Sequence, residues 1–199
     1  MMMVGAGSDA AWEARWASYD EATYARALAF VPPGAVVLDI GAGDLRFARQ
    51  LAASARLIYA VERRPELLAA AAAWLRQADN VCAVCADARD WPFPPGLDVA
   101  VLLMRHCAHF ALYRRKLEAV GCRWLITNAR WRMAVECIDL AAPAWPYGCV
   151  SPGWYACRCG ATGFRDAPAE TLTEAMLAEV HEVEGCPGCK DGQSSLRLP

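Results

Sequence analysis

Apolar residues in the first two thirds of the chain fall into short runs of strand length, separated by segments with helical spacing. The runs contain almost no polar positions, which is typical of strands buried on both faces of a parallel sheet. Strands that alternate with helices pair in parallel through right-handed crossovers. We therefore predict an α/β fold with a doubly wound, mostly parallel sheet. The predicted strands cover residues 35–40, 57–62, 81–87, 97–104 and 122–128.

The two ends of this α/β pattern differ from its middle. Residues 10–30 carry aromatic and aliphatic residues at helical spacing, so we predict one or two helices that form an amino-terminal lid. Residues 131–142 also predict a helix. A stretch rich in proline, glycine and aromatic residues follows, and we place a domain boundary there, giving a core over 1–143 and a cysteine-rich segment over 144–199. In that segment, Thr171 and Glu174 have the spacing of a capping box that begins a short helix.

The net charge and the lengths of the apolar runs indicate which classes of binding partner are unfavourable for this protein. A net charge of −2 supplies no general attraction for phosphates, so a nucleic-acid partner is not favoured, although local groups of arginines keep one open. No apolar run is long enough to span a bilayer, so we expect no membrane partner. The first residues lack the pattern of a secretory signal, and we expect a cytoplasmic protein. The sequence does not indicate an oligomeric state.

Acidic residues end three successive predicted strands. These are Asp39, Glu62 and Asp87, and the first of them opens the turn Gly41-Ala42-Gly43-Asp44. Ligands of doubly wound sheets bind outside the carboxyl ends of the strands, where glycines let the backbone approach a ligand. A carboxylate after the second strand can accept the hydroxyls of a ribose. The pattern therefore predicts a nucleoside-binding site.

The residues VLDIGAG resemble the first motif of the class I S-adenosylmethionine-dependent methyltransferases, acidic-x-Gly-x-Gly-x-Gly, and the resemblance covers residues 35–130. It implies S-adenosylmethionine as cofactor, with Asp39 beside its methionine portion, Glu62 on the ribose and Asp87 on the adenine amino group. Leu45 stands where the family often has its third glycine. The implied cofactor site comprises Asp39, Gly41, Ala42, Gly43, Asp44, Glu62, Arg63, Asp87 and Ala88.

A dinucleotide site is the main alternative, because it also uses a glycine-rich turn. It fits less well. Arg46 occupies the place of the third glycine in that fingerprint, and Asp39 would repel a pyrophosphate. A turn without any ligand is the other alternative, which three acidic strand ends make less favourable.

Four of the ten cysteines form two close pairs, Cys157 with Cys159 and Cys186 with Cys189. Four thiolates with tetrahedral geometry make a closed structural zinc site, so we predict one zinc ion. Unpaired reduced thiols and a redox function of the second pair are the alternatives.

Methyl transfer requires an acceptor site after the fourth and fifth strands, where we look for a base. His106 is the first candidate and His109 the second, because an imidazole can accept a proton near neutral pH. Asn128 is a candidate for orienting the acceptor by hydrogen bonding, and Arg105 or Arg130 for holding an anionic group.

Two functional hypotheses follow from these patterns. The first is a methyltransferase whose acceptor is a small molecule or a protein side chain, with RNA left open. The sequence lacks the Asn/Asp-Pro-Pro-aromatic and Pro-Cys motifs that would indicate methylation of nucleic-acid bases. The second is a non-catalytic partner protein that keeps the fold and uses the zinc segment to bind another macromolecule.

Overall fold

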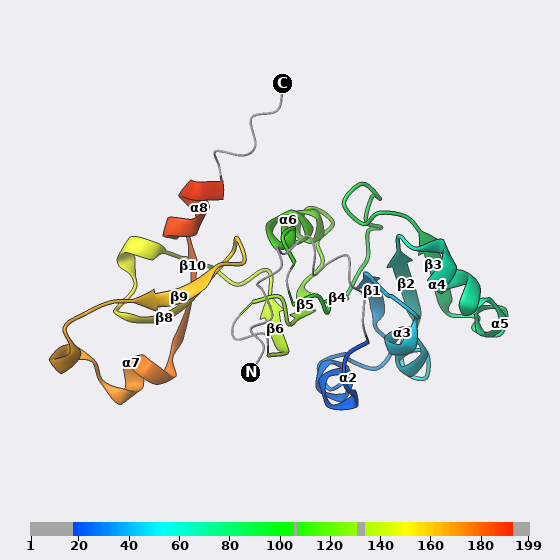
Figure 1. Ribbon diagram of the computed structural model, residues 1–199, viewed down its shortest axis with the longest axis horizontal. Coiled ribbons are helices and arrows are strands. Elements are labelled where there is room, and N and C mark those ends of the chain that lie inside the picture. The colour runs from blue at the N-terminus through cyan, green and yellow to red at the C-terminus, as the bar shows by residue number, and fades with distance from the viewer. Residues whose placement is uncertain (1–17, 106, 131–133, 193–199) are drawn as a thin grey trace, which may run out of the picture. The chain divides into compact units, whose positions relative to one another are not determined.

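A computed structural model describes residues 18–105, 107–130 and 134–192, which form two units. The first unit contains the described residues up to 129 together with 134–140, and the second contains 130 and 141–192. Figure 1 shows the order of the elements along the chain. No helix of the described residues is long and apolar enough to cross a membrane.

The first unit is built on a six-stranded sheet with the order β3-β2-β1-β4-β5-β6. All neighbouring strands are parallel except β5 and β6, which are antiparallel. Strand order reverses between β1 and β4, so the crevice for a ligand lies at their carboxyl ends. The strands are β1 (Val36–Ile40), β2 (Leu57–Glu62), β3 (Val81–Cys85), β4 (Val99–Leu102), β5 (Trp124–Thr127) and β6 (Glu136–Asp139).

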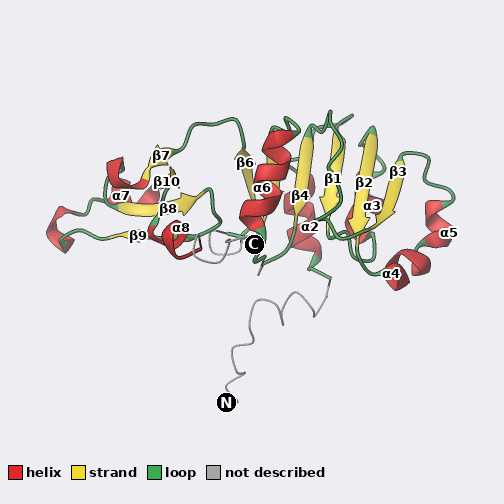
Figure 2. Cartoon of the chain, turned by 90° about the horizontal axis from the view of Figure 1, so that it is seen from above, coloured by secondary structure: helices red, strands yellow, loops and turns green. Residues whose placement is uncertain are grey.

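Helices cover both faces of this sheet because alternate strand residues point to opposite sides. Val37 and Val99 pack into one core with residues of α2 and α3, whereas Leu38 and Ala100 pack into a second core with α6. Figure 2 shows the strands side by side with α6 alongside β4. The helices of the first unit are α2 (Glu21–Leu28), α3 (Arg46–Leu51), α4 (Pro65–Ala70), α5 (Ala72–Leu75) and α6 (Phe110–Ala119).

The doubly wound, mostly parallel sheet confirms the predicted fold class. Two local predictions within the first unit were wrong. The segment predicted as a helix over 131–142 contains strand β6, which pairs with β5 through Ile138 and Leu125. Strand β3 is not buried on both faces, because it forms the edge of the sheet.

The second unit has a four-stranded sheet with the order β7-β10-β8-β9. Strand β10 is parallel to β7 and β8, and β9 is antiparallel to β8. The predicted short helix is α7, but its cap is Thr173 and not Thr171: the Thr173 hydroxyl accepts a hydrogen bond from the Met176 amide. The elements are β7 (Trp145–Pro146), η2 (Tyr147–Cys149), β8 (Gly153–Cys157), β9 (Thr162–Arg165), η3 (Ala169–Thr171), α7 (Glu174–Ala178), β10 (Val180–Glu184) and α8 (Pro187–Gly192).

Candidate functional site

A cavity of about 480 Å³ lies at the carboxyl ends of the parallel strands of the first unit. Its volume is in the range of small-molecule sites. The segment before and within α2 adds Tyr19 and Tyr24 to its wall, and Tyr24 stacks on Phe47 with 5.8 Å between ring centroids. Eight of the nine predicted cofactor residues line the cavity: Asp39, Gly41, Ala42, Asp44, Glu62, Arg63, Asp87 and Ala88.

Asp39 is the penultimate residue of β1 and is buried beside Glu62. Its Oδ2 atom has no hydrogen-bond partner among the described residues. Burial, followed by the negative charge of Glu62, raises the pKa of Asp39 to about 7. A buried carboxylate with an unused acceptor favours a cationic or hydrogen-bond-donating ligand group in this part of the cavity.

The turn after β1 depends on glycine at two positions. Gly41 has φ +73°, and a Cβ atom there would lie 3.1 Å from Met104 Cε. Gly43 has φ +56°, and its amide donates a hydrogen bond of 2.9 Å to Glu62 Oε2. Gly43, the ninth predicted cofactor residue, therefore contributes by holding Glu62.

Glu62 is fixed by the backbone on both sides. Its Oε1 atom accepts a hydrogen bond of 2.9 Å from the Arg64 amide, while Oε2 accepts the bond from Gly43. Each carboxylate oxygen has a second lone pair. A buried, fixed carboxylate with these lone pairs is suited to accept hydrogen bonds from a diol such as ribose.

Asp87 lies after β3, and its carboxylate is paired with Arg89. Three side-chain hydrogen bonds connect the two residues, and the Arg89 amide donates to Asp87 Oδ1 at 2.9 Å. These bonds from the Arg89 side chain hold the pKa of Asp87 at about 2, against the opposing effect of burial. The pairing of Arg89 with Asp87 was not predicted from the sequence. A residue two positions after an aspartate is nevertheless a common partner for such a local hydrogen bond.

The structure places the residues predicted to act on the methyl acceptor in different surroundings. His106 lies outside the described residues. His109 lines the cavity at the amino end of α6, with its ring 6.4 Å from that of Tyr113. Asn128 is fully buried, does not line the cavity, and has no hydrogen-bond partner for its amide among the described residues. Arg105 lines the cavity, and its amide donates to the Tyr19 hydroxyl at 3.0 Å.

In the second unit, the four predicted metal ligands lie together. The sulfur atoms of Cys157, Cys159, Cys186 and Cys189 are all within 4.8 Å of one another. Three of the pairs are separated by 3.6, 3.6 and 3.8 Å. A tetrahedral zinc ion with Zn–S bonds of about 2.3 Å requires sulfur atoms about 3.8 Å apart. The cluster therefore fits zinc in both donor type and spacing.

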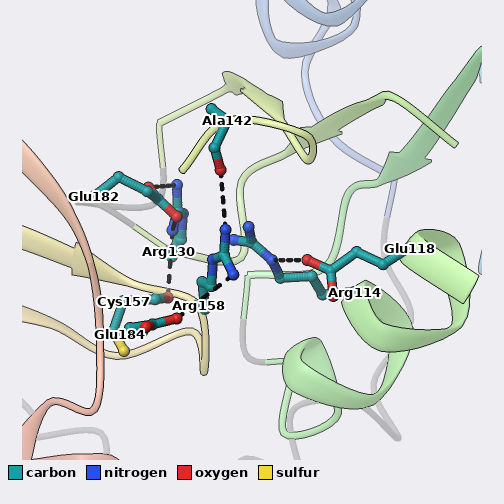
Figure 3. Close-up of polar contacts among 8 residues, drawn as sticks. All are labelled: Arg114, Glu118, Arg130, Ala142, Cys157, Arg158, Glu182 and Glu184. Carbon is teal, nitrogen blue, oxygen red and sulfur yellow. Dashed lines mark hydrogen bonds and ion pairs between the residues drawn. The ribbon is translucent and has the colours of Figure 1, made fainter. Parts of the chain in front are cut away.

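Two buried or half-buried arginines hold the backbone near this cluster, as Figure 3 shows. Arg130 forms a bidentate ion pair with Glu182, with distances of 2.9 and 2.7 Å, and also donates to the Cys157 carbonyl. Arg158 donates to the Ala142 carbonyl and lies 3.5 Å from Glu184. Arg130 is thus part of the second unit's structure, contrary to its suggested function of holding an anionic acceptor.

The fold and the cavity define the first unit as an α/β domain with a small-molecule-sized cavity at its switch point. Residues 37–124 match the family model described as "Methyltransferase domain". This match confirms that residues 37–124 resemble the class I S-adenosylmethionine-dependent methyltransferases. No curated protein matches the chain.

Solved structures similar to the chain include the precorrin 8w decarboxylase of Methanobacterium thermoautotrophicum, with 22% identity, 58% of this chain and 66% of that chain covered, and a TM-score of 0.49. The precorrin-6y C5,15-methyltransferase of Geobacter metallireducens GS-15 has 19% identity, 55% and 62% coverage, and a TM-score of 0.48. The phosphoethanolamine N-methyltransferase 1 of Haemonchus contortus, in complex with phosphoethanolamine and S-adenosylhomocysteine, has 20% identity, 54% and 25% coverage, and a TM-score of 0.46. The chain spans less than two thirds of the length of each of these structures.

Proposed function

We propose that the first unit binds S-adenosylmethionine in its cavity and transfers the methyl group to a small molecule or a protein side chain. The observation that supports this most directly is the convergence of Asp39, Glu62 and Asp87 on one cavity beside the glycine turn. A turn without a ligand has no need of three carboxylates on one cavity. In the proposed binding mode, Glu62 accepts the ribose hydroxyls, Asp87 the adenine amino group, and Asp39 lies near the methionine portion.

When bound, S-adenosylmethionine supplies a methyl group on a positively charged sulfur. A lone pair of the acceptor forms the new bond to carbon while the carbon–sulfur bond breaks, which leaves S-adenosylhomocysteine. The protein contributes mainly by positioning the acceptor in line with that bond. An acceptor that carries a proton must lose it, and His109 is the imidazole of the described residues that lines the cavity.

The charges of the second unit support an acceptor other than nucleic acid. Its described residues, 130 and 141–192, contain seven acidic and four basic side chains, an excess that repels a phosphate backbone. The acidic residues are Asp166, Glu170, Glu174, Glu179, Glu182, Glu184 and Asp191.

We also propose that the second unit holds one structural zinc ion through Cys157, Cys159, Cys186 and Cys189. The sulfur spacing supports this proposal. A metal would stabilise a unit whose core is small, because the hydrophobic cluster of its described residues has four buried members, two of them cysteines of the site.

Isothermal titration calorimetry with S-adenosylmethionine and S-adenosylhomocysteine tests the proposed function. We expect wild-type protein to bind both with micromolar affinity, and Glu62→Gln to bind at least tenfold more weakly because the carboxylate is lost. Glu66→Gln, an exposed change in α4, is the matched control and should bind as wild type does. No binding to wild-type protein at millimolar concentrations would contradict the proposal.

Transfer itself is measured with S-adenosylmethionine labelled in the methyl group. We expect label to appear in a small-molecule or protein fraction of a cell extract with wild-type protein, and not with Glu62→Gln. Label found in the RNA fraction alone would contradict the proposed acceptor class.

A further inference from the structure

Lys116 of α6 binds three backbone carbonyls of the loop after β3. Its ammonium group donates hydrogen bonds to three backbone carbonyls of that loop: Ala88 at 2.6 Å, Arg89 at 2.9 Å and Trp91 at 2.7 Å. It also lies 4.2 Å from the centroid of the Phe93 ring. An ammonium group has three N–H donors, so these carbonyls use its full donor capacity.

Lys116 acts on the same peptide unit as Asp87. The carbonyl of Ala88 and the amide of Arg89 belong to one planar peptide group. Lys116 donates to the carbonyl end of this group, while Asp87 Oδ1 accepts from its amide end at 2.9 Å. The orientation of the peptide group therefore connects Lys116 to the Asp87 carboxylate.

The loop is preorganised by its own hydrogen bonds as well. The amides of Asp90 and Trp91 both donate to the Asp87 carbonyl, at 3.1 and 2.9 Å. Asp87 and Ala88 line the cavity, whereas Lys116 is not among the residues that do. Lys116 therefore does not contact a ligand in the cavity, and its hydrogen bonds act on the loop that does.

The protonation state of Asp87 determines which ligand group can form a hydrogen bond with it. Because hydrogen bonds from Arg89 keep its pKa at about 2, the carboxylate stays ionised at neutral pH and can only accept hydrogen bonds. A base with an exocyclic amino group can donate to it, whereas a base with a carbonyl at that place would be repelled. The position of this carboxylate therefore determines the selectivity for the base.

We propose that Lys116 is a positioning residue that sets the base selectivity of the cofactor site by fixing the loop that carries Asp87 and Ala88. This inference rests on the proposed function, because it assigns the adenine end of the same cofactor.

The test compares S-adenosylhomocysteine with S-inosylhomocysteine, in which a carbonyl replaces the exocyclic amino group. Calorimetry gives the ratio of the two dissociation constants for each variant. We expect wild-type protein to prefer the adenosine compound at least tenfold, and Lys116→Met to reduce this ratio threefold or more. Met keeps the apolar stem but donates no hydrogen bond. Arg115→Met, an exposed change on the same helix, is the matched control and should keep the wild-type ratio.

The ratio separates positioning from stability, because loss of folded protein weakens both compounds equally and leaves the ratio unchanged. An unchanged ratio in folded Lys116→Met overturns the inference alone. Failure of wild-type protein to bind S-adenosylhomocysteine overturns the proposed function and this inference with it.

If Lys116→Met does not fold, a measurement on wild-type protein tests the inference instead. Hydrogen exchange of the amides of Arg89, Asp90 and Trp91 is followed in ligand-free protein. We expect these amides to be protected before any ligand is added, because they donate to Asp87 in a loop whose carbonyls Lys116 already holds. Unprotected amides that become protected only on binding would overturn the inference.

Discussion

Individual carboxylates at the strand ends were predictable, but their surroundings were not. Asp39, Glu62 and Asp87 follow apolar runs whose ends are visible in the sequence, so their common edge of the sheet follows from parallel pairing. Asn128 also follows a strand, yet its side chain is buried away from the cavity. The direction of a side chain after a strand depends on tertiary neighbours, which the local pattern does not contain.

The raised pKa of Asp39 makes the stability of the ligand-free protein depend on pH. A carboxyl group with a higher pKa in the folded than in the unfolded chain keeps its proton longer when folded. The folded state then loses stability as pH rises from about 4 to about 7, with about 1.4 kcal/mol for each unit of pKa difference.

We therefore expect Asp39→Asn to gain stability relative to wild type between pH 5 and pH 8, by a few kcal/mol. Urea unfolding without ligand at several pH values measures this difference. Asp79→Asn, at an exposed position, serves as control and should show no such gain. A difference between Asp39→Asn and wild type that stays constant over this range would contradict the prediction.

Glu182 shows how a residue far along the chain supports the cysteine cluster. Removing one partner of a buried ion pair costs about 3–5 kcal/mol, and Glu182 is the bidentate partner of Arg130. We expect Glu182→Gln to lose zinc to a chelator faster than wild type. Glu184→Gln is the matched control, because the Glu184 side chain is 53% exposed and its contact to Arg158 is longer. Equal rates in the two variants would contradict the expectation.

At the scale of elements, the glycine turn leads into α3 through a residue with unusual backbone geometry. Leu45 has φ +61° and is fully buried. It occupies the position of the family's third glycine, where a left-handed conformation suits glycine but costs other residues roughly 1–2 kcal/mol. Burial of the leucine side chain in the core offsets that cost, so the sequence departs from the motif while the backbone keeps its shape.

This geometry predicts an unusual order of stability for two variants. Leu45→Ala removes the buried side chain and keeps the strain, at a cost of about 3 kcal/mol. Leu45→Gly removes the same side chain but relieves the strain, so it should be less destabilising by about 1 kcal/mol. Thermal or urea unfolding measures both. A glycine variant less stable than the alanine variant would contradict the left-handed geometry.

Most elements of the sheet were predicted because their apolar runs match strand length, and the exceptions have tertiary causes. Strand β6 was predicted as part of a helix, since its residues fit helical spacing. Pairing of Ile138 with Leu125 of β5 decides its conformation instead. Cys82 and Cys85 are exposed because β3 lies at the sheet edge, and strand order cannot be obtained from local periodicity.

At the scale of the whole molecule, the chain combines an α/β unit that resembles a methyltransferase domain with a cysteine-containing unit, and the domain boundary after residue 143 stays a prediction. The four cysteines of the cluster come from two separate segments of the second unit, one at the end of β8 and in the turn before β9, and one after β10. A metal ion would therefore close a loop of the chain as well as fill a coordination site.

We expect elemental analysis of protein purified without added metal to find about one zinc ion per chain. Cys157→Ser and Cys189→Ser should lose it and make the second unit sensitive to proteolysis. Cys149→Ser changes an exposed cysteine of the same unit and should keep the metal. Metal-free wild-type protein with an intact second unit would contradict the prediction.

The buried carboxyl group of Asp39 also connects cofactor capture to acidity. A cationic ligand beside Asp39 would draw its pKa down again, so binding near pH 7 would expel roughly half a proton for each cofactor taken up. Calorimetry in buffers with different ionisation enthalpies would detect this exchange as a buffer-dependent heat, absent from Asp39→Asn. Cofactor uptake by this domain would then strengthen in alkaline surroundings and weaken in acidic ones.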